Sequence, residues 1–122
     1  MSFGKTTPVL RIFDEAEARA FYLDFLGFHL DWQHRCTHDL PLYMQVSRGE
    51  CVLHLSEHQG DGSPGAALRI HTDELEDFQQ QLLARQLPFT DPRIQAMPWG
   101  SLDMTIDDPF GNRLVFTRTI SA

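Results

Sequence analysis

An internal repeat limits most strongly what this chain can fold into. The stretch LRIFDEAEARAFYLDFLGF, residues 10–28, is echoed by LRIHTDELEDFQQQLLARQLPF, residues 68–89. Both stretches open with Leu-Arg-Ile, continue through acidic residues into an amphipathic segment, and end at a Phe after a Gly or Pro. About 60 residues alone bury too little surface for a robust core. The 122 residues are therefore expected to form one domain, residues 1–122, from two modules that share a core.

The first module, residues 7–60, is predicted to begin with a strand and a helix. The apolar run at residues 8–12 is typical of a strand. Asp14 stands where a helix N-cap is expected, and Gly27 stands where a glycine commonly ends a helix. Between them, apolar residues recur at helical spacing and predict one buried face: Ala18, Phe21, Tyr22, Phe25 and Leu26.

Three more strands complete the first module in this prediction. Residues 28–34 alternate apolar and polar side chains, which is the period of a strand with one buried face. Residues 43–56 contain two strand-like runs joined by a turn at residues 48–50. The predicted order is therefore βαβββ.

The second module, residues 65–120, follows a linker-like segment with three glycines and one proline at residues 57–65. Its predicted helix begins at Asp73 as the N-cap, and its buried face is predicted from Leu75, Phe78, Leu82 and Leu83. Its four strands are predicted at residues 66–71, 93–97, 101–107 and 112–118. The fold class is accordingly α+β, with tandem βαβββ modules that form curved mixed sheets around a cleft, a natural place for a ligand.

The charge and the N-terminus limit the classes of partner. The net charge of −7 argues against binding to nucleic acid phosphates, and it either attracts a cationic ligand or simply keeps the protein soluble. No apolar run approaches the roughly 20 residues needed to span a bilayer, and the first residues lack the apolar region of a signal peptide. We therefore expect a cytoplasmic protein without a membrane partner, in which Cys36 and Cys51 are free thiols.

Two motifs carry a family resemblance. The repeat, together with FYLDFLGF at residues 21–28 and DDPFGNRLVF at residues 107–116, resembles the vicinal oxygen chelate superfamily over essentially the whole chain. That superfamily includes glyoxalase I, extradiol dioxygenases, and fosfomycin- and bleomycin-resistance proteins. The chain is most similar to the bleomycin-resistance proteins, in MPWGSLDMTIDDPFGNRLVF at residues 97–116 and CVLHLSEHQ at residues 51–59.

The resemblance also bears on metal binding. Enzymes of this superfamily hold a divalent metal through side chains on cleft-facing strands, and matching strand to strand places those positions on Thr7, His54, a residue near Gly65, and Val115. Only His54 is a good metal ligand, whereas a catalytic site typically takes three protein ligands. We therefore expect no metal, no cofactor and no catalytic residue.

The resemblance implies a function and an assembly. The favoured interpretation is a small-molecule binding protein that sequesters a bleomycin-type or related planar cationic compound without turnover, in grooves at a homodimer interface. Residues 2–8 would then be an arm that crosses to the partner subunit. One alternative is a metal-dependent lyase, isomerase or dioxygenase with an atypical ligand set. Another is a scaffold that binds no small ligand.

Three aromatic residues are candidates for ligand contact. Trp99 lies between Pro98 and Gly100, which favours a loop where the indole serves as a stacking surface for a flat ligand group. The resemblance places Tyr43 opposite it across the cleft. Trp32 lies on the predicted strand at residues 28–34 and is the third candidate. The alternative for Trp99 is a loop residue folded onto the core, and the alternative for Tyr43 is an ordinary aromatic residue of a strand.

Three polar residues complete the predicted site. His54 lies on the fourth predicted strand, and Arg69 is expected to point to the cleft, because its neighbours Leu68 and Ile70 are expected to pack under the second helix. Asp103 is a candidate contact for a ligand cation. Asp107 is also considered, although it is expected mainly to shape the turn before Pro109. The alternative for Arg69 is a solvated strand edge.

Overall fold

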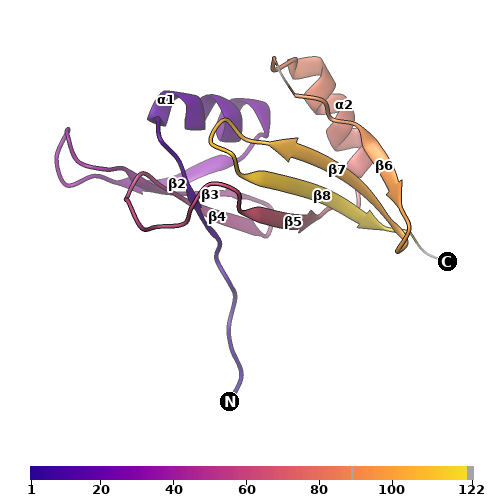
Figure 1. The fold of residues 1–122 in the computed structure, drawn as a ribbon, viewed down its shortest axis with the longest axis horizontal. Coiled ribbons are helices and arrows are strands. Elements are labelled where there is room, and N and C mark those ends of the chain that lie inside the picture. Colours follow the sequence, from indigo (N-terminus) through magenta and orange to yellow (C-terminus); the bar gives the residue numbers. More distant parts are fainter. Residues whose placement is uncertain (89, 121–122) are drawn as a thin grey trace. The chain divides into compact units, whose positions relative to one another are not determined.

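The computed structural model describes residues 1–88 and 90–120, and the chain divides into two compact units, Met1–Pro64 and Gly65–Ala122. Each unit contains one four-stranded mixed sheet and one helical segment, in the order βαβββ (Figure 1). The α+β class and its tandem βαβββ modules are thus confirmed. Phe89, which ends the second copy of the repeat, lies outside the described residues.

The sheet of the first unit has the strand order β1-β4-β3-β2. β1 runs parallel to β4, and the other neighbours are antiparallel. The first Leu-Arg-Ile therefore supplies an edge strand that returns to pair with the last strand of its unit. The bounds are β1 (Val9–Arg11), β2 (His29–His34), β3 (Tyr43–Arg48) and β4 (Cys51–Ser56).

The helix of the first unit begins as predicted but changes its winding. Asp14 caps α1 (Glu15–Ala18), because its side chain accepts a hydrogen bond from the Glu17 amide at 2.8 Å. The chain then continues as a π-helical segment, η1 (Arg19–Phe25), and the Leu26 amide donates to the Phe21 carbonyl five residues back at 2.9 Å. All five residues predicted to form the buried face are buried, since their spacing of three and four residues suits both kinds of helix.

The two faces of the first sheet differ in character. Leu10, Met44, Val46, Leu53 and Leu55 are buried, and they share one face because side chains alternate along each strand. On the other face, Tyr43 and Gln45 of β3 and His54 of β4 are only partly buried. This second face holds the polar and aromatic side chains described below.

The sheet of the second unit has the same topology, with the order β5-β8-β7-β6 and β5 parallel to β8. Each strand lies within one residue of its predicted bounds. The observed elements are β5 (Ala67–His71), α2 (Leu75–Arg85), β6 (Ile94–Met97), β7 (Ser101–Asp107) and β8 (Arg113–Thr119). No helix in the described part of the chain is long and apolar enough to cross a membrane.

The predicted start and buried face of α2 need correction. Glu74, not Asp73, is the N-cap, and its amide donates to the Thr72 hydroxyl at 3.3 Å. Leu83 is exposed, whereas the other three predicted residues are buried. Leu83 follows Leu82 by one residue, which rotates it about 100° away from the buried stripe.

The turn between β7 and β8 is shaped by a different aspartate from the one expected. Asp108 accepts hydrogen bonds from the amides of Phe110 and Asn112, each at 2.8 Å, and is buried. Asp107, the predicted residue, instead forms an exposed ion pair with Arg113 at 3.2 Å. The physical reason is strand alternation, since only one of two adjacent aspartates can face into the turn.

Candidate functional site

Three of the predicted residues meet on the partly exposed face of the first sheet. Trp32 on β2 stacks on Tyr43 on β3, with ring centroids 6.0 Å apart and planes inclined by 12°. His54 on β4 meets both rings edge-on, at 5.4 Å from Trp32 and 5.2 Å from Tyr43. These three residues are called the aromatic cluster below. Trp32 remains 44% exposed, so the cluster presents aromatic surface to solvent.

Hydrogen bonds hold the aromatic cluster in place. The Tyr43 hydroxyl lies 2.6 Å from His54 Nδ1, and His54 Nε2 lies 2.9 Å from Gln45 Oε1. Because an amide oxygen can only accept, Nε2 carries a proton, and in the neutral imidazole Nδ1 then accepts from the Tyr43 hydroxyl. Burial raises the pKa of Tyr43, and the charge of Asp61 adds to this effect, so the phenol stays a donor.

The chain of hydrogen bonds continues beyond Gln45. Gln45 Nε2 donates to Asp31 Oδ2 at 3.1 Å, and the Ser47 hydroxyl donates to Asp31 Oδ1 at 3.0 Å. Sequence analysis missed both Gln45 and Asp31. Gln45 could have been found, because it lies two residues from Tyr43 on β3 and directly opposite His54 on β4. Asp31 could not, because simple alternation places it on the face opposite Trp32.

The environment of His54 does not suit the divalent metal of the superfamily's enzymes. Both of its ring nitrogens already have partners, so a metal would have to displace Tyr43 or Gln45. Within residues 1–88 and 90–120, no three side chains of His, Cys, Asp or Glu come together in a way that could hold a metal ion. The polar groups around His54 instead form a continuous hydrogen-bonded network.

The second unit has a polar cluster of its own. Asp103 Oδ1 accepts hydrogen bonds from the Thr117 hydroxyl at 2.6 Å, the Ser101 hydroxyl at 2.9 Å and Arg69 Nη2 at 3.0 Å. The Asp103 side chain is 7% exposed, whereas that of Arg69 is 46% exposed. Burial alone would raise the pKa of Asp103, but hydrogen bonds from Thr117, Ser101 and Arg69 outweigh it and lower the pKa.

The structure thus brings the predicted residues Arg69 and Asp103 together as an ion pair. Asp103 is an ionised anchor for the Arg69 guanidinium, which still faces solvent in part. The contact of Asp103 with a ligand cation stays a prediction.

Trp99 lies in the tight turn between β6 and β7 and is 65% exposed. The Gly100 amide closes this turn on the Met97 carbonyl at 3.1 Å, and Gly100 adopts a φ of 95°, which favours glycine. The predicted loop position of Trp99 is therefore confirmed. The aromatic cluster belongs to the first unit and Trp99 to the second. That Trp99 faces Tyr43 stays a prediction.

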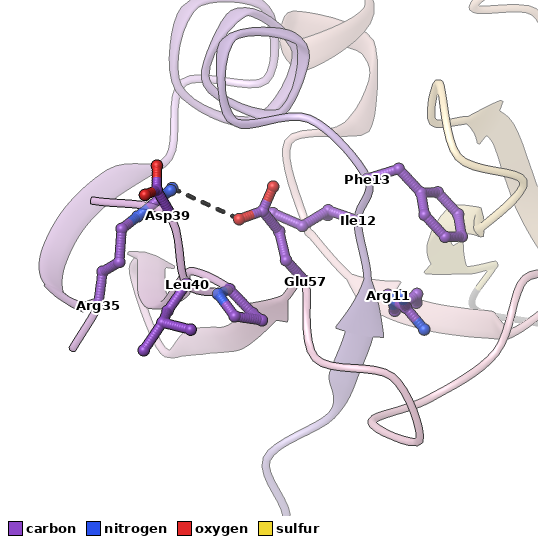
Figure 2. A pocket seen from close by; sticks show the side chains of 8 residues that line it. Arg11, Ile12, Phe13, Arg35, Asp39, Leu40 and Glu57 are labelled. Carbon is purple, nitrogen blue, oxygen red and sulfur yellow. Dashed lines mark hydrogen bonds and ion pairs between the residues drawn. The ribbon is translucent and has the colours of Figure 1, made fainter. Parts of the chain in front are cut away.

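A pocket of about 320 Å³ lies elsewhere on the first unit (Figure 2). Arg35 crosses it to reach Glu57 at 3.4 Å, and the Arg11 guanidinium lies 4.8 Å from the centre of the Phe13 ring. None of the six predicted site residues lines it; the lining is Arg11, Ile12, Phe13, Arg35, Asp39, Leu40, Pro41 and Glu57. Half of these lining residues are charged, two arginines and two carboxylates, whereas small-molecule sites are lined predominantly by apolar and aromatic side chains. We therefore place the candidate site at the aromatic cluster.

Comparison with solved structures places this fold among known proteins. A bleomycin-binding protein in complex with bleomycin is 24% identical, with a TM-score of 0.73 over 96% of this chain and 99% of that chain. The bleomycin-binding protein of bleomycin-producing Streptomyces verticillus, in complex with copper(II)-bleomycin, is also 24% identical, with a TM-score of 0.71 over 100% of this chain and 99% of that one.

A third similar structure comes from the same broad group. It is a member of the glyoxalase/bleomycin resistance protein/dioxygenase superfamily from Sphaerobacter thermophilus, 20% identical, with a TM-score of 0.69 over 92% of this chain and 94% of that one. No curated protein matches the chain significantly in sequence. The family model described as glyoxalase superfamily protein matches residues 1–122. With its whole length matched, and with the fold and strand order described above, the chain belongs to the glyoxalase superfamily.

Proposed function

We propose that this protein binds and sequesters a planar, positively charged compound of the bleomycin type without changing it. The observation that carries this proposal is the exposed stack of Trp32 on Tyr43. His54 holds this stack through its hydrogen bond with the Tyr43 hydroxyl. Aromatic side chains that are both exposed and held in one orientation are suited to stacking on a flat ligand group, because little conformational freedom is lost on binding.

The hydrogen bonding of the cluster favours binding over turnover. A general base needs a free acceptor within reach of the substrate, and a metal ligand needs a free lone pair. His54 Nδ1 already accepts from Tyr43, and its Nε2 already donates to Gln45. The imidazole therefore holds the side chains of Tyr43 and Gln45 in one orientation. The net charge of −7 favours a cationic ligand over an anionic one.

The proposal includes a homodimer and a second stacking surface. β2 and β6 each lie at an edge of their sheet, and exposed edges tend to be covered or paired. Trp99, exposed in its turn, is the proposed second surface for the ligand. Sedimentation at micromolar concentration tests the assembly, and a monomer there would contradict this part of the proposal.

Calorimetric titration with metal-free and copper-loaded bleomycin tests the function. We expect Trp32→Ala and Trp99→Ala each to lower the affinity by several-fold to about a hundredfold, which corresponds to up to about 3 kcal/mol. Phe13→Ala is the matched control, because it removes an exposed aromatic residue outside the aromatic cluster. Mass spectrometry of the recovered compound should show it unchanged.

Two results would overturn the proposal. One is the absence of binding at high micromolar bleomycin. The other is chemical conversion of the compound by protein that carries near-stoichiometric zinc, nickel, manganese or iron, which would favour the enzymatic alternative. Equal affinity of wild type and Trp99→Ala would remove only Trp99 from the site.

A further inference from the structure

β2 contains an irregularity at the aromatic cluster. Leu30 pairs with Val46 and Trp32 pairs with Gln45, so two steps along β2 match a single step along β3. Asp31 is the extra residue of this β-bulge. In a regular strand, adjacent residues point to opposite faces of the sheet. A bulge breaks this alternation and redirects a side chain. The side chains of Asp31 and Trp32 consequently both lie on the face of the sheet that carries Gln45.

Two contacts show where the Asp31 carboxylate lies. It accepts hydrogen bonds from the side chains of Gln45 and Ser47, at 3.1 Å and 3.0 Å. Gln45 also holds His54, and Tyr43 is two residues away on the same strand, so all of these side chains lie on one face. The carboxylate is thus next to the stacked rings, even though the sequence pattern assigns it to the other side of the sheet.

Asp31 is exposed and ionised, and its charge is not matched by an arginine or lysine. The hydrogen bonds from Gln45 and Ser47 lower its pKa, and the nearby His29 adds a smaller electrostatic effect in the same direction. In the described part of the chain, no lysine or arginine forms an ion pair with it. Asp103 differs in this respect, because it is buried and paired with Arg69. The first sheet therefore presents an available negative charge beside an available aromatic surface.

In the hydrogen-bond chain, each side chain donates to the next one, and the last acceptor is Asp31. Tyr43 donates to His54, His54 donates to Gln45, and Gln45 donates to Asp31. One network thereby fixes the orientation of the Tyr43 ring and the position of the carboxylate together. A ligand that uses both would meet two groups already held at a set separation, which is the advantage of a preorganised site.

We propose that Asp31 is the charge-recognition residue of this protein, and that it binds the cationic group of a planar aromatic cation stacked on Trp32. The inference rests on the proposed function, since it assigns the ligand class at the same aromatic cluster. It adds one requirement to that class: the positive charge of the ligand must be able to reach Asp31 while the flat ring is stacked on Trp32. A neutral ring of the same shape would stack without using Asp31.

The test compares two flat probes by fluorescence titration at pH 8. Proflavine is a planar cation at this pH, and acridine is its uncharged parent ring. The proteins are wild type, Asp31→Asn, Asp39→Asn and Trp32→Ala. Asp31→Asn keeps an oxygen that can accept from Gln45, and its NH₂ group can donate to the Ser47 hydroxyl, which then accepts instead of donating. The side chain can therefore keep both partners while its charge is lost. Asp39→Asn removes the same charge from a side chain that is 97% exposed and lies outside the aromatic cluster.

We expect Asp31→Asn to weaken proflavine about two- to fivefold and to leave acridine unchanged, which is the range of an exposed ion pair. Trp32→Ala should weaken both probes, and Asp39→Asn neither. The effect of Asp31→Asn on proflavine should shrink as sodium chloride is raised, because salt screens exposed charges.

The outcomes separate the two proposals. If Trp32→Ala weakens both probes but Asp31→Asn changes neither, or changes both equally, the aromatic site stands and the role of Asp31 is wrong. If Asp39→Asn has the same effect as Asp31→Asn, the attraction is only that of net charge, and the inference also fails. If wild type binds neither probe, or binds both independently of Trp32, the aromatic site itself is wrong and the inference falls with it.

Discussion

Replacing Asp103 with asparagine should reveal how much the second unit depends on its buried carboxylate. The side chain of Asp103 is 7% exposed, and its Oδ1 accepts from Arg69, Ser101 and Thr117. Asp103→Asn keeps the shape but removes the charge. It also brings an NH₂ group, which can only donate, among side chains that already donate.

The expected loss follows from burial and from the exposure of the partner. A hydrogen bond to a charged group contributes about 1.5–3 kcal/mol, and breaking a fully buried ion pair costs about 3–5 kcal/mol. The Arg69 side chain is 46% exposed, so water can take over part of the solvation of its guanidinium. We therefore expect a loss of about 2 kcal/mol, which for a chain of this size lowers the Tm by roughly 6–10 °C.

Asp107→Asn is the matched control for thermal unfolding followed by circular dichroism. Asp107 is on the same strand and also pairs with an arginine, but both side chains of that pair are about 60% exposed. An exposed pair contributes at most about 1 kcal/mol and often less. We expect the Tm of Asp107→Asn to fall by no more than about 5 °C. Equal losses for the two variants would refute the assignment of Asp103 as a buried anchor.

The pH dependence gives a second check. The pKa of Asp103 is lowered in the folded protein from its ordinary value of 3.8. Its ionised form therefore adds stability that is fully present well above pH 3.8 and is lost as the pH falls through the lowered pKa. The difference in unfolding free energy between wild type and Asp103→Asn should be constant at neutral pH and should shrink in strong acid. A difference that stays constant down to about pH 2 would contradict this mechanism.

Three further predictions concern the backbone, the thiols and the turn. Gly62→Ala should lower the Tm more than Gly60→Ala, because both glycines have positive φ but only at Gly62 would a Cβ lie 2.8 Å from a backbone oxygen of β1. Cys36 should react with iodoacetamide faster than Cys51, because Cys36 is exposed whereas burial raises the pKa of Cys51; mass spectrometry of the labelled peptides gives the order. Asp108→Ala should lower the unfolding free energy in urea by about 2 kcal/mol, since it leaves two buried amide donors without their acceptor.

Most of the strand framework could be predicted because its signal is local. β7 alternates polar and apolar residues over Ser101–Asp107, and its bounds match the prediction. Leu10 and Leu68 begin the two copies of the repeat, and each lies in an edge strand that pairs in parallel with the last strand of its unit. Such pairing follows once the βαβββ order is recognised, since parallel strands need a crossover connection.

The features that could not be predicted depend on departures from regular periods. Residues spaced for an α-helix also suit η1, so the change in winding after Ala18 leaves no trace in the sequence. The bulge at Asp31 reverses the expected direction of one side chain, and no glycine or proline marks it. The choice between Asp107 and Asp108 depends on which of two neighbours faces into the turn. In each case the local sequence is compatible with more than one conformation, and tertiary packing determines which one forms.

The two sheets have the same strand order but differ in which charges they leave available. In the second unit, Asp103 pairs across the strands with Thr117 and neutralises Arg69, so that face is electrostatically balanced at its centre. In the first unit, the corresponding antiparallel pair of strands places Gln45 opposite His54, and their hydrogen bonds end at Asp31. Among the described residues, no arginine or lysine forms an ion pair with this carboxylate, which adjoins the exposed Trp32. The repeat therefore accounts for the shared strand order. The side chains at a few cross-strand positions give one unit a structural ion pair and the other the aromatic cluster proposed as the binding site.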